Sequence, residues 1–359
     1  MVDKINSILN KLGYEVDLVN IVERVNCSFL YYDFNEKKEN KEKFNLIKDL
    51  RQKIKFISQY EQIELDITTG DKTDFIITYI HNIKNNIINF DDKKYDFLKN
   101  IVKPEDIFFG LDAEGIPRVY NLVDMPHILI AGATGSGKSV MINNIICSLI
   151  KYCEPYRKPN FYMIDTKQVE LSPYKKLKKA KNSPNLKRVA TNVEDALDLL
   201  YSITCLIQAK YEVMQENNQK TIGYYMPKDV VIIDELADLM ISSKKEVEEY
   251  IVKIAQLGRA CGVHLIIATQ NPVVKVLTGL IKANLSCRIA LKTASSIESR
   301  NILDHNGAEL LNGNGDFLLK LPSQQSEIKL QCPYVSIECI NNIINEYNNM
   351  EWNYEGNNT

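Results

Sequence analysis

The sequence has no pair of cysteines spaced as Cys-x-x-Cys, and its four histidines are dispersed along 359 residues. These absences argue against a metal framework, because such sites need ligands at short, fixed spacings. Of the eight cysteines, Cys147, Cys205 and Cys287 lie in apolar segments, where a buried thiol is the ordinary interpretation. This use of cysteine indicates a reducing, cytoplasmic setting.

Long apolar runs are also lacking. None approaches the roughly 20 residues that a membrane span needs, and the N-terminus, MVDKINSILNKLGYEVD, has no signal-peptide core. Nor does charge of one sign predominate, since 44 basic and 46 acidic residues leave a net charge of −2. We therefore expect no membrane span and no global attraction to nucleic acid or anionic lipid. A nucleic-acid role would need a local basic surface.

What is present is ordinary for a soluble protein, with 45% hydrophobic and 25% charged residues. The length suggests two domains. We expect a small N-terminal α+β region over residues 1–100, a larger domain over 101–350 and a flexible tail over 351–359. The polar stretch 91–100 is interpreted as a linker between the first two.

The N-terminal region carries a helical pattern followed by an alternating one. Residues 36–60 predict an amphipathic helix, and the alternation from Ile63, with a turn signal at 69–71, predicts a hairpin after it. The residues expected on the apolar face of the helix are Phe44, Ile47, Leu50, Ile54 and Ile57.

Beyond residue 107, short apolar runs alternate with longer helical stretches. Such runs are typical of buried parallel strands, and their alternation with helices predicts an α/β fold with a central, mostly parallel sheet. A lysine run over 175–188 is interpreted as a solvated loop. The expected strands are 127–131, 161–164, 230–233, 264–268, 288–291 and 317–319.

Residues 132–139 read GATGSGKS and match GxxxxGK[ST] in full, between an expected strand and an expected helix. Glycines let backbone N–H groups turn toward phosphates, and the start of the helix adds its positive dipole end. Lys138 is expected to pair with phosphate oxygens and Ser139 to ligate Mg²⁺. This phosphate cradle predicts a site for ATP and Mg²⁺, made by Gly132, Ala133, Thr134, Gly135, Ser136, Gly137, Lys138 and Ser139.

Polar residues follow two further expected strands. Asp234 and Glu235 end the apolar run 230–233. We expect Asp234 to hold Mg²⁺, directly or through water, and Glu235 to act as the general base on the attacking water. Gln270, after the run 264–268, is expected to sit beside the γ-phosphate and report its loss, although a simple strand-end amide is an equally good interpretation.

From about residue 107 to 347 the sequence resembles the FtsK/SpoIIIE family of DNA translocases. DELADLM (234–240) and TGLIKAN (278–284) are nearly diagnostic of it. Three positions depart from the family pattern, with Thr166, Asn271 and Ser296 in place of proline, arginine and lysine. The other strings that carry the resemblance are 109–112, 115–117, 125–127, 164–167, 170–172, 299–300, 302–304, 307–309 and 313–316.

The resemblance implies a RecA-like P-loop motor that assembles as a ring, normally a hexamer, around double-stranded DNA. It implies that Arg259 reaches the γ-phosphate of a neighbouring subunit, and that Lys282, with Lys275 second, contacts the DNA backbone. We expect neither the membrane anchor nor the winged-helix domain of the cell-division members, which leaves recruitment by a membrane partner open. A minimal motor of this kind resembles translocases of plasmids, phages or integrating elements.

Three functions are compatible with these residues. An ATP-driven DNA translocase is favoured by the string around Lys282, although Asn271 and Ser296 reduce that margin. The alternative is a secretion-system ATPase of the same superfamily that acts on protein substrates. A ring that binds ATP only as a scaffold fits poorly with the intact catalytic set, which is Lys138, Asp234, Glu235 and Arg259.

Overall fold

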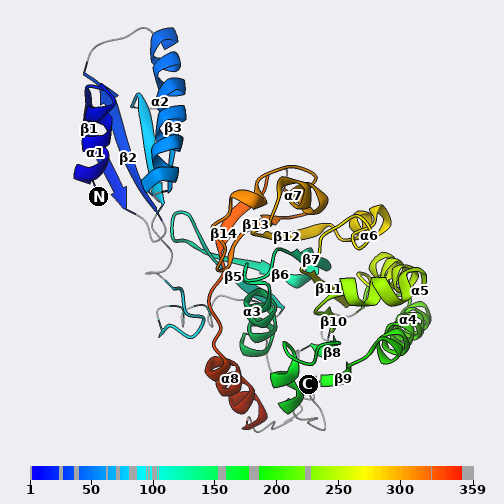
Figure 1. Cartoon of the computed structure of the whole chain (residues 1–359). Helices are drawn as coiled ribbons and strands as arrows, with labels where there is room; N and C mark the ends of the chain where they lie inside the picture. Colours follow the sequence, from blue (N-terminus) through cyan, green and yellow to red (C-terminus); the bar gives the residue numbers. More distant parts are fainter. Residues whose placement is uncertain are drawn as a thin grey trace. The chain divides into compact units, whose positions relative to one another are not determined.

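The computed structural model describes residues 2–23, 27–35, 40–61, 64–69, 73–80, 87–93, 95, 98, 103, 105–152, 159–177, 186–222, 228–324 and 326–349. The chain divides into two compact units, residues 1–87 with 113–116, and residues 88–112 with 117–359. Each unit is built on a sheet of its own (Figure 1).

The first unit is a four-stranded antiparallel sheet in the order β1-β2-β4-β3. The predicted helix and hairpin are confirmed as α2, β3 and β4, whereas α1 and the β1–β2 pair were not predicted. Both helices pack their apolar residues on one face of the sheet. The elements are α1 (Val2–Lys11), β1 (Val16–Glu23), β2 (Cys27–Phe34), α2 (Asn40–Glu61), β3 (Glu64–Thr69) and β4 (Phe75–Ile80).

The apolar face of α2 differs from the predicted one at its N-terminal end. Ile47 and Leu50 are buried as expected, but Phe44 is 62% exposed. On a helix, Phe44 lies beside Ile47 on the side away from Leu50, so it falls at the edge of the apolar stripe. The side chains of Ile54 and Ile57 lie outside the described residues.

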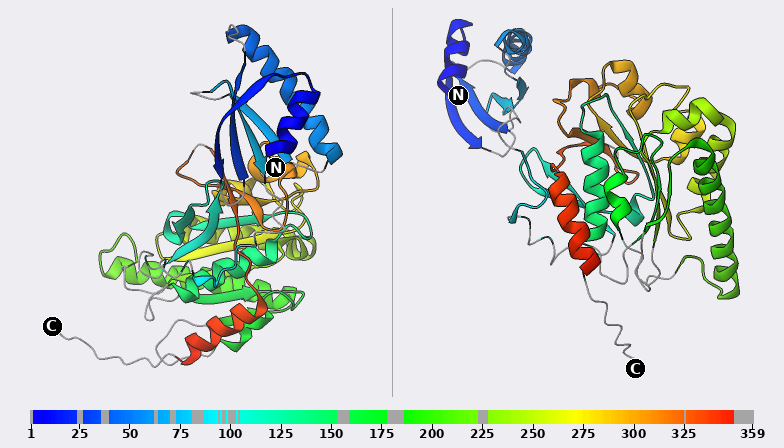
Figure 2. Two further views of the ribbon diagram at one scale, coloured as in Figure 1. Left: turned by 90° about the vertical axis from the view of Figure 1, so that its left-hand side faces the viewer. Right: turned by 60° about the horizontal axis from the view of Figure 1, so that its bottom comes forward.

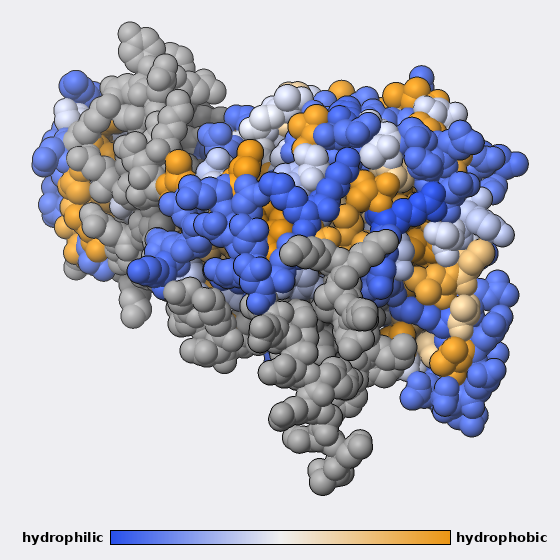
Figure 3. All heavy atoms as spheres, turned by 90° about the horizontal axis from the view of Figure 1, so that it is seen from below, coloured by the Kyte–Doolittle hydropathy of each residue, from blue (hydrophilic) through white to orange (hydrophobic). Residues whose placement is uncertain are grey.

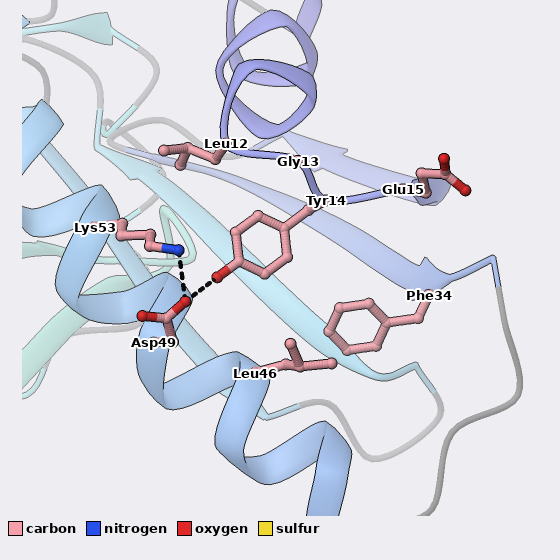
Figure 4. Close-up of a pocket in the computed structure, with 8 residues that line it drawn as sticks. All are labelled: Leu12, Gly13, Tyr14, Glu15, Phe34, Leu46, Asp49 and Lys53. Atoms are coloured by element: carbon pink, nitrogen blue, oxygen red, sulfur yellow. Dashed lines mark hydrogen bonds and ion pairs between the residues drawn. The ribbon is translucent and has the colours of Figure 1, made fainter.

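A hollow of about 410 Å³ opens between α2 and the turn after α1, and Figure 4 shows its lining. The Tyr14 hydroxyl donates to Asp49 Oδ2 at 2.6 Å, and Lys53 Nζ lies 2.7 Å from the same oxygen. Both bonds lower the pKa of Asp49, and the bond from Lys53 has the larger effect. They tie α2 to the turn after α1.

The second unit is built on a ten-stranded sheet in the order β6-β5-β14-β13-β12-β7-β11-β10-β8-β9. From β12 to β9 the neighbouring strands pair in parallel, and the others pair antiparallel. The strands are β5 (Asp106–Asp112), β6 (Pro117–Asn121), β7 (His127–Ala131), β8 (Asn160–Ile164), β9 (Leu186–Ala190), β10 (Asp229–Ile233), β11 (Val263–Thr269), β12 (Cys287–Leu291), β13 (Asp316–Lys320) and β14 (Ile328–Gln331).

The predicted α/β fold with a mostly parallel central sheet is therefore confirmed. Each expected strand exists within one or two residues of its predicted ends, but β13 is antiparallel rather than parallel. The end of the lysine run, interpreted as a solvated loop, instead contributes Lys187 and Arg188 to β9. β9 is an edge strand whose one buried residue is Ala190, so its sequence lacks the apolar run that marks the central strands.

Helices cover both faces of this sheet (Figures 1 and 2). One face packs against α3 and α8, and the other against α4, α5 and the shorter α6 and α7. The helices are α3 (Lys138–Lys151), α4 (Val193–Glu216), α5 (Leu236–Leu257), α6 (Gly279–Asn284), α7 (Ser296–Leu303) and α8 (Ile337–Asn349).

The polar segment before β5 belongs to the core of the second unit. Phe90 N donates to Tyr334 O at 3.0 Å, and Tyr334 N donates to Ile88 O at 2.6 Å. Phe90, Tyr95 and Leu98 are all buried in the core. The linker interpretation of 91–100 is therefore wrong where that stretch is described. Its few apolar residues are spaced irregularly, so no helix or strand period reveals their burial.

Within the described residues, no helix is long and apolar enough to cross a membrane. On the face seen in Figure 3, hydrophobic and hydrophilic residues are interspersed.

Two buried histidines face each other at the amino-terminal edge of the sheet. His127 begins β7 and accepts a bond from Leu265 N at 3.1 Å, while His264 Nδ1 donates to Pro126 O at 3.1 Å. Burial, reinforced by the neighbouring charges of Arg259 for His127 and of Lys228 and Lys210 for His264, lowers the pKa of His127 to about 4 and that of His264 to about 3. Both rings are therefore neutral at pH 7.

We expect this pair to make the fold sensitive to mild acid. Unfolded histidines titrate near 6.5, so below that pH the unfolded chain binds more protons than the folded one. Stability is then lost as the pH falls from 6.5 toward 4, by about 2–4 kcal/mol at pH 5. Urea unfolding at pH 7.5 and 5 measures the loss. Imidazole NMR gives the direct check, and a ring of this pair that titrates near 6.5 contradicts the assignment.

Candidate functional site

The predicted cradle and the predicted acids meet at the carboxyl-terminal edge of the parallel strands. β11 lies between β7 and β10, so the residues that follow these three strands are neighbours in space. Residues 132–139 follow β7, Asp234 and Glu235 follow β10, and Thr269 ends β11 with Gln270 directly after it. The site is thus assembled from segments that are up to 138 residues apart.

The cradle has the backbone that its glycines predict. Gly135 and Gly137 have φ angles of 77° and 107°, which side chains other than glycine rarely adopt. A Cβ atom at Gly137 would lie 2.6 Å from Gly315 N, and Gly315 N itself donates to Ser136 O at 2.9 Å. The loop that contains Gly315 therefore packs directly against the cradle and depends on both glycines.

A small hollow of about 130 Å³ opens on this cradle. It is lined by residues 133–136, by Lys292 and by residues 312–314. The buried Ser136 Oγ has no hydrogen-bond partner in the part of the chain that the structure describes. Since buried hydroxyls are normally bonded, this atom fits a cradle that receives an oxygen-rich group. Lys292 and the loop 312–314 were not predicted as site residues, although the string GNGD (313–316) had marked that loop.

Lys138 and Asp234 form a buried ion pair in this structure. Lys138 Nζ lies 2.7 Å from Asp234 Oδ1 and donates to Asp234 O at 2.6 Å. Their side chains are only 3% and 4% exposed. Burial raises the pKa of Asp234, and the charge of Lys138 opposes that rise. Ser139 lies half-buried in the first turn of α3, so the residues predicted to bind phosphate and Mg²⁺ are close together.

Glu235 caps the N-terminus of α5, and its carboxylate is held by four hydrogen bonds. Oε1 accepts from the Thr269 hydroxyl at 2.6 Å, from Ala237 N at 3.3 Å and from Gln270 N at 3.2 Å, while Oε2 accepts from Gln270 N at 3.0 Å. Glu235 is 5% exposed. The predicted base is thus tied to the end of β11, and Thr269 is a site residue that was not predicted.

Gln270 connects this carboxylate to the cradle. Its backbone N–H bonds to Glu235, and its side-chain Oε1 accepts from the Thr134 hydroxyl at 3.0 Å. The structure therefore brings together the cradle, Lys138, Asp234, Glu235 and Gln270. Among the described residues, no cluster of three or more His, Cys, Asp or Glu has metal-ligand geometry, so a metal here would need a hydroxyl or phosphate ligand in addition.

Arg259 lies at the opposite edge of the sheet. Gly258 O accepts from Val263 N, the first residue of β11, at 2.9 Å. Arg259 is exposed and shares a hollow of about 490 Å³ with Met125 and Pro126, which precede β7. Five residues of extended strand span about 16 Å, so β7 separates Arg259 from the cradle of its own chain.

The predicted DNA contacts are also apart from the cradle. Lys275 is exposed in the segment between β11 and α6, and Lys282 lies in α6 with a 23% exposed side chain. Lys282 Nζ is 3.2 Å from Asp304 Oδ1, and Asp304 also accepts from Arg288 at 2.5 Å. These bonds, acting against burial, lower the pKa of Asp304. Lys282 therefore has a carboxylate partner in this structure.

Comparison with known sequences finds the family that the sequence resembles. The family model described as FtsK/SpoIIIE family matches residues 99–228 and 225–274. The chain is 44% identical over 231 residues to the DNA translocase FtsK of Chlorobaculum tepidum, with 61% of this chain and 29% of that protein covered. It is 44% identical over 248 residues to the DNA translocase SftA of Bacillus subtilis, with 66% and 25% covered. The chain thus spans less than a third of either relative.

Solved structures show the same fold. The monomer form of the pCW3 conjugation coupling protein TcpA with ATPγS has a TM-score of 0.64 at 24% identity, covering 94% of this chain and 97% of that one. The cytoplasmic domain of the type VII secretion ATPase EccC of Thermomonospora curvata has a TM-score of 0.57 at 24% identity, covering 69% and 31%. At these identities the likeness is one of fold alone, an α/β fold with a RecA-like central sheet.

Proposed function

Because the chain belongs to the FtsK/SpoIIIE family, we propose that it is an ATP-driven translocase of double-stranded DNA that works as a ring, normally a hexamer. The observation that carries the proposal is the carboxyl-terminal sheet edge, where a complete phosphate cradle, the Lys138–Asp234 pair and the bonded Glu235 adjoin. The relatives that share this sequence at 44% identity are named DNA translocases. The proposal extends to a role in the transfer of a plasmid, phage or integrating element, with a cytoplasmic location and recruitment by a membrane partner.

The residues present fit ATP and Mg²⁺. The Ser136 hydroxyl, which has no hydrogen-bond partner among the described residues, and the glycine-rich cradle suit phosphate oxygens. The Ser139 hydroxyl and the Asp234 carboxylate are oxygen ligands of the kind that Mg²⁺ prefers. When bound, Mg²⁺ would supply charge neutralisation at the phosphates. Lys138 would exchange its bond with Asp234 for phosphate oxygens, which leaves the Asp234 carboxylate available to the metal.

Hydrolysis itself would rest on Glu235. A carboxylate beside the cradle can accept the proton of the attacking water, provided that it is released from at least one of its present bonds. Gln270, which bonds to both Thr134 and Glu235, would report whether the γ-phosphate is in place. Arg259, at the other edge of the sheet, would act on the nucleotide of a neighbour, where a cation stabilises transition-state charge.

The DNA grip would come from a few lysines repeated around the ring, because the net charge of −2 gives no global attraction. Phosphate contacts carry affinity without sequence information. Lys282, with Lys275 second, is the proposed contact. Without DNA, Lys282 pairs with Asp304 instead.

Changing Lys282 tests the proposal most directly. Lys282→Ala should weaken duplex binding about equally for all sequences and reduce DNA-stimulated ATP hydrolysis, and Lys282→Glu should do so more strongly, because phosphate contacts read charge rather than bases. Wild-type binding should also weaken as salt is added. Duplex affinity and ATPase rate with and without DNA are the measurements.

The matched control is Lys220→Glu, the same charge reversal at an exposed position beyond α4, which should change neither quantity. If wild-type ATPase ignores DNA altogether, the translocase proposal fails and a secretion ATPase acting on protein substrates gains support. If DNA stimulates the wild type but Lys282→Glu behaves like it, only the placement of Lys282 in the DNA channel is wrong.

A further inference from the structure

Thr269, the last residue of β11, places one hydroxyl between two groups with different tasks. Its O–H donates to Glu235 Oε1 at 2.6 Å, and its Oγ1 accepts from Asn271 N at 3.1 Å. A threonine hydroxyl can donate one bond and accept others at the same time. Thr269 is fully buried, so both bonds are shielded from water and their geometry is fixed by the strand.

The bond to Glu235 is one of the strong kind. A hydroxyl that donates to a carboxylate makes a charge-assisted bond, which is shorter and stronger than a neutral one, and 2.6 Å is in that range. Together with Gln270 N, it means that Thr269 and the residue after it supply three of the four bonds that hold the carboxylate. Any shift at this strand end would therefore move Glu235.

The other bond leads to the segment that carries Lys275, the second of the proposed DNA contacts. Asn271 begins a loop whose backbone is held by hydrogen bonds within the loop. Asn271 O accepts from Val273 N at 2.9 Å, and Val273 O accepts from Val276 N and Leu277 N, both at 2.9 Å. The loop exposes Val273, Val274 and Lys275. A force on the loop would therefore displace Asn271 rather than deform the loop itself.

The far end of the loop is fixed as well. Thr278 caps α6, the helix of Lys282, by accepting from Ile281 N at 3.3 Å, and its hydroxyl also bonds to Glu248 of α5. With α6 anchored to α5, displacement of the loop falls on its Asn271 end. At that end, among the described residues, Asn271 N bonds to Thr269 toward the site, and Pro272 O accepts from Asn301 Nδ2 of α7 at 2.9 Å.

We propose that Thr269 is the positioning residue that couples DNA contact at loop 271–277 to the Glu235 carboxylate. The inference rests on the proposed function, because it assumes that DNA engages this loop. Gln270 and Thr269 then divide the work at the end of β11. The Gln270 side chain faces the cradle through Thr134 and responds to nucleotide, while Thr269 faces the loop and responds to DNA.

Thr269→Val is the sharpest test, because it keeps the shape of the side chain and removes both bonds. We expect the ratio of DNA-stimulated to basal ATPase to fall close to one. The KM for ATP and the duplex affinity should stay within about twofold of wild type, since the cradle and the lysines are untouched. Thr269→Ser restores the hydroxyl and should recover at least half of the stimulation ratio. Thr269→Ala also removes both bonds and leaves a smaller side chain. If Thr269→Val folds too poorly to assay, Thr269→Ala should show the same low stimulation ratio.

The control for losing a buried hydroxyl is Thr204→Val on α4, whose hydroxyl bonds only to Tyr201 O among the described residues. It should keep the wild-type ratio. The inference is overturned if Thr269→Val and Thr269→Ala remain stimulated as wild type is, or if Thr269→Ser loses stimulation as fully as they do. A wild type that DNA does not stimulate would instead refute the proposed function, and this inference with it.

Discussion

Glu235→Gln should bind ATP about as tightly as wild type and hydrolyse it at least a hundredfold more slowly. An amide cannot accept the proton of the attacking water, and loss of a general base typically costs about 10²–10⁴ in rate. The substitution keeps the size of the side chain and an oxygen that can still accept from Thr269, so the fold and the cradle should be unaffected. With hydrolysis blocked, ATP should also hold the assembled ring together.

Three measurements check this result: ATP affinity by calorimetry, single-turnover hydrolysis and assembly by light scattering with ATP. Glu212→Gln makes the same chemical change on the exposed surface of α4, and it should leave turnover unchanged. Equal turnover in Glu235→Gln and wild type would remove Glu235 from the role of base.

Arg259→Ala should lower the ATPase rate by about a thousandfold while each subunit keeps its cradle, because arginines supplied to a neighbour's phosphate contribute about 10³–10⁵ in rate. Lys138→Ala should also be inactive, for the different reason that it cannot bind ATP tightly. Each variant therefore lacks what the other retains.

Mixing the two inactive proteins distinguishes action on a neighbour from action within one chain. In randomly mixed rings about a quarter of the interfaces join an intact cradle to an intact arginine, so part of the activity should return. Mixing Arg259→Ala with itself at the same total concentration is the control. Full activity of Arg259→Ala alone, or no recovery in mixtures that demonstrably co-assemble, would exclude the assignment.

The central strands could be predicted because a strand that is buried on both faces consists mainly of consecutive apolar residues. Every residue of β7 and β11 is buried, and their ends were predicted to within a residue or two. Strands with one polar face, such as β9, carry no such run, and neither do β1 and β2 of the first unit. Phe44 was misplaced because a helical period does not say where a helix meets its sheet.

The cradle could be predicted in detail because its chemistry is local to eight consecutive residues. The contacts that complete the site are not local. The bond from Thr269 to Glu235 depends on β11 lying beside β10, and the bond from Lys282 to Asp304 joins residues 22 positions apart. Lys282 and Glu235 can be picked out in the sequence, but their partners cannot, because strand order and helix packing decide which side chains meet.

The position of Arg259 and the cradle at opposite edges of one sheet limits how copies of this chain can join. Two copies related by a twofold axis share one surface in which every contact occurs twice, so a twofold pair would use both arginines and both cradles at once. A head-to-tail interface instead pairs one arginine with one cradle, and such contacts form closed rings or open rows. An open row always leaves one cradle and one arginine unused at its ends. With Arg259 acting on a neighbour, closure turns the last idle cradle into a working one, so activity per subunit should rise steeply with protein concentration.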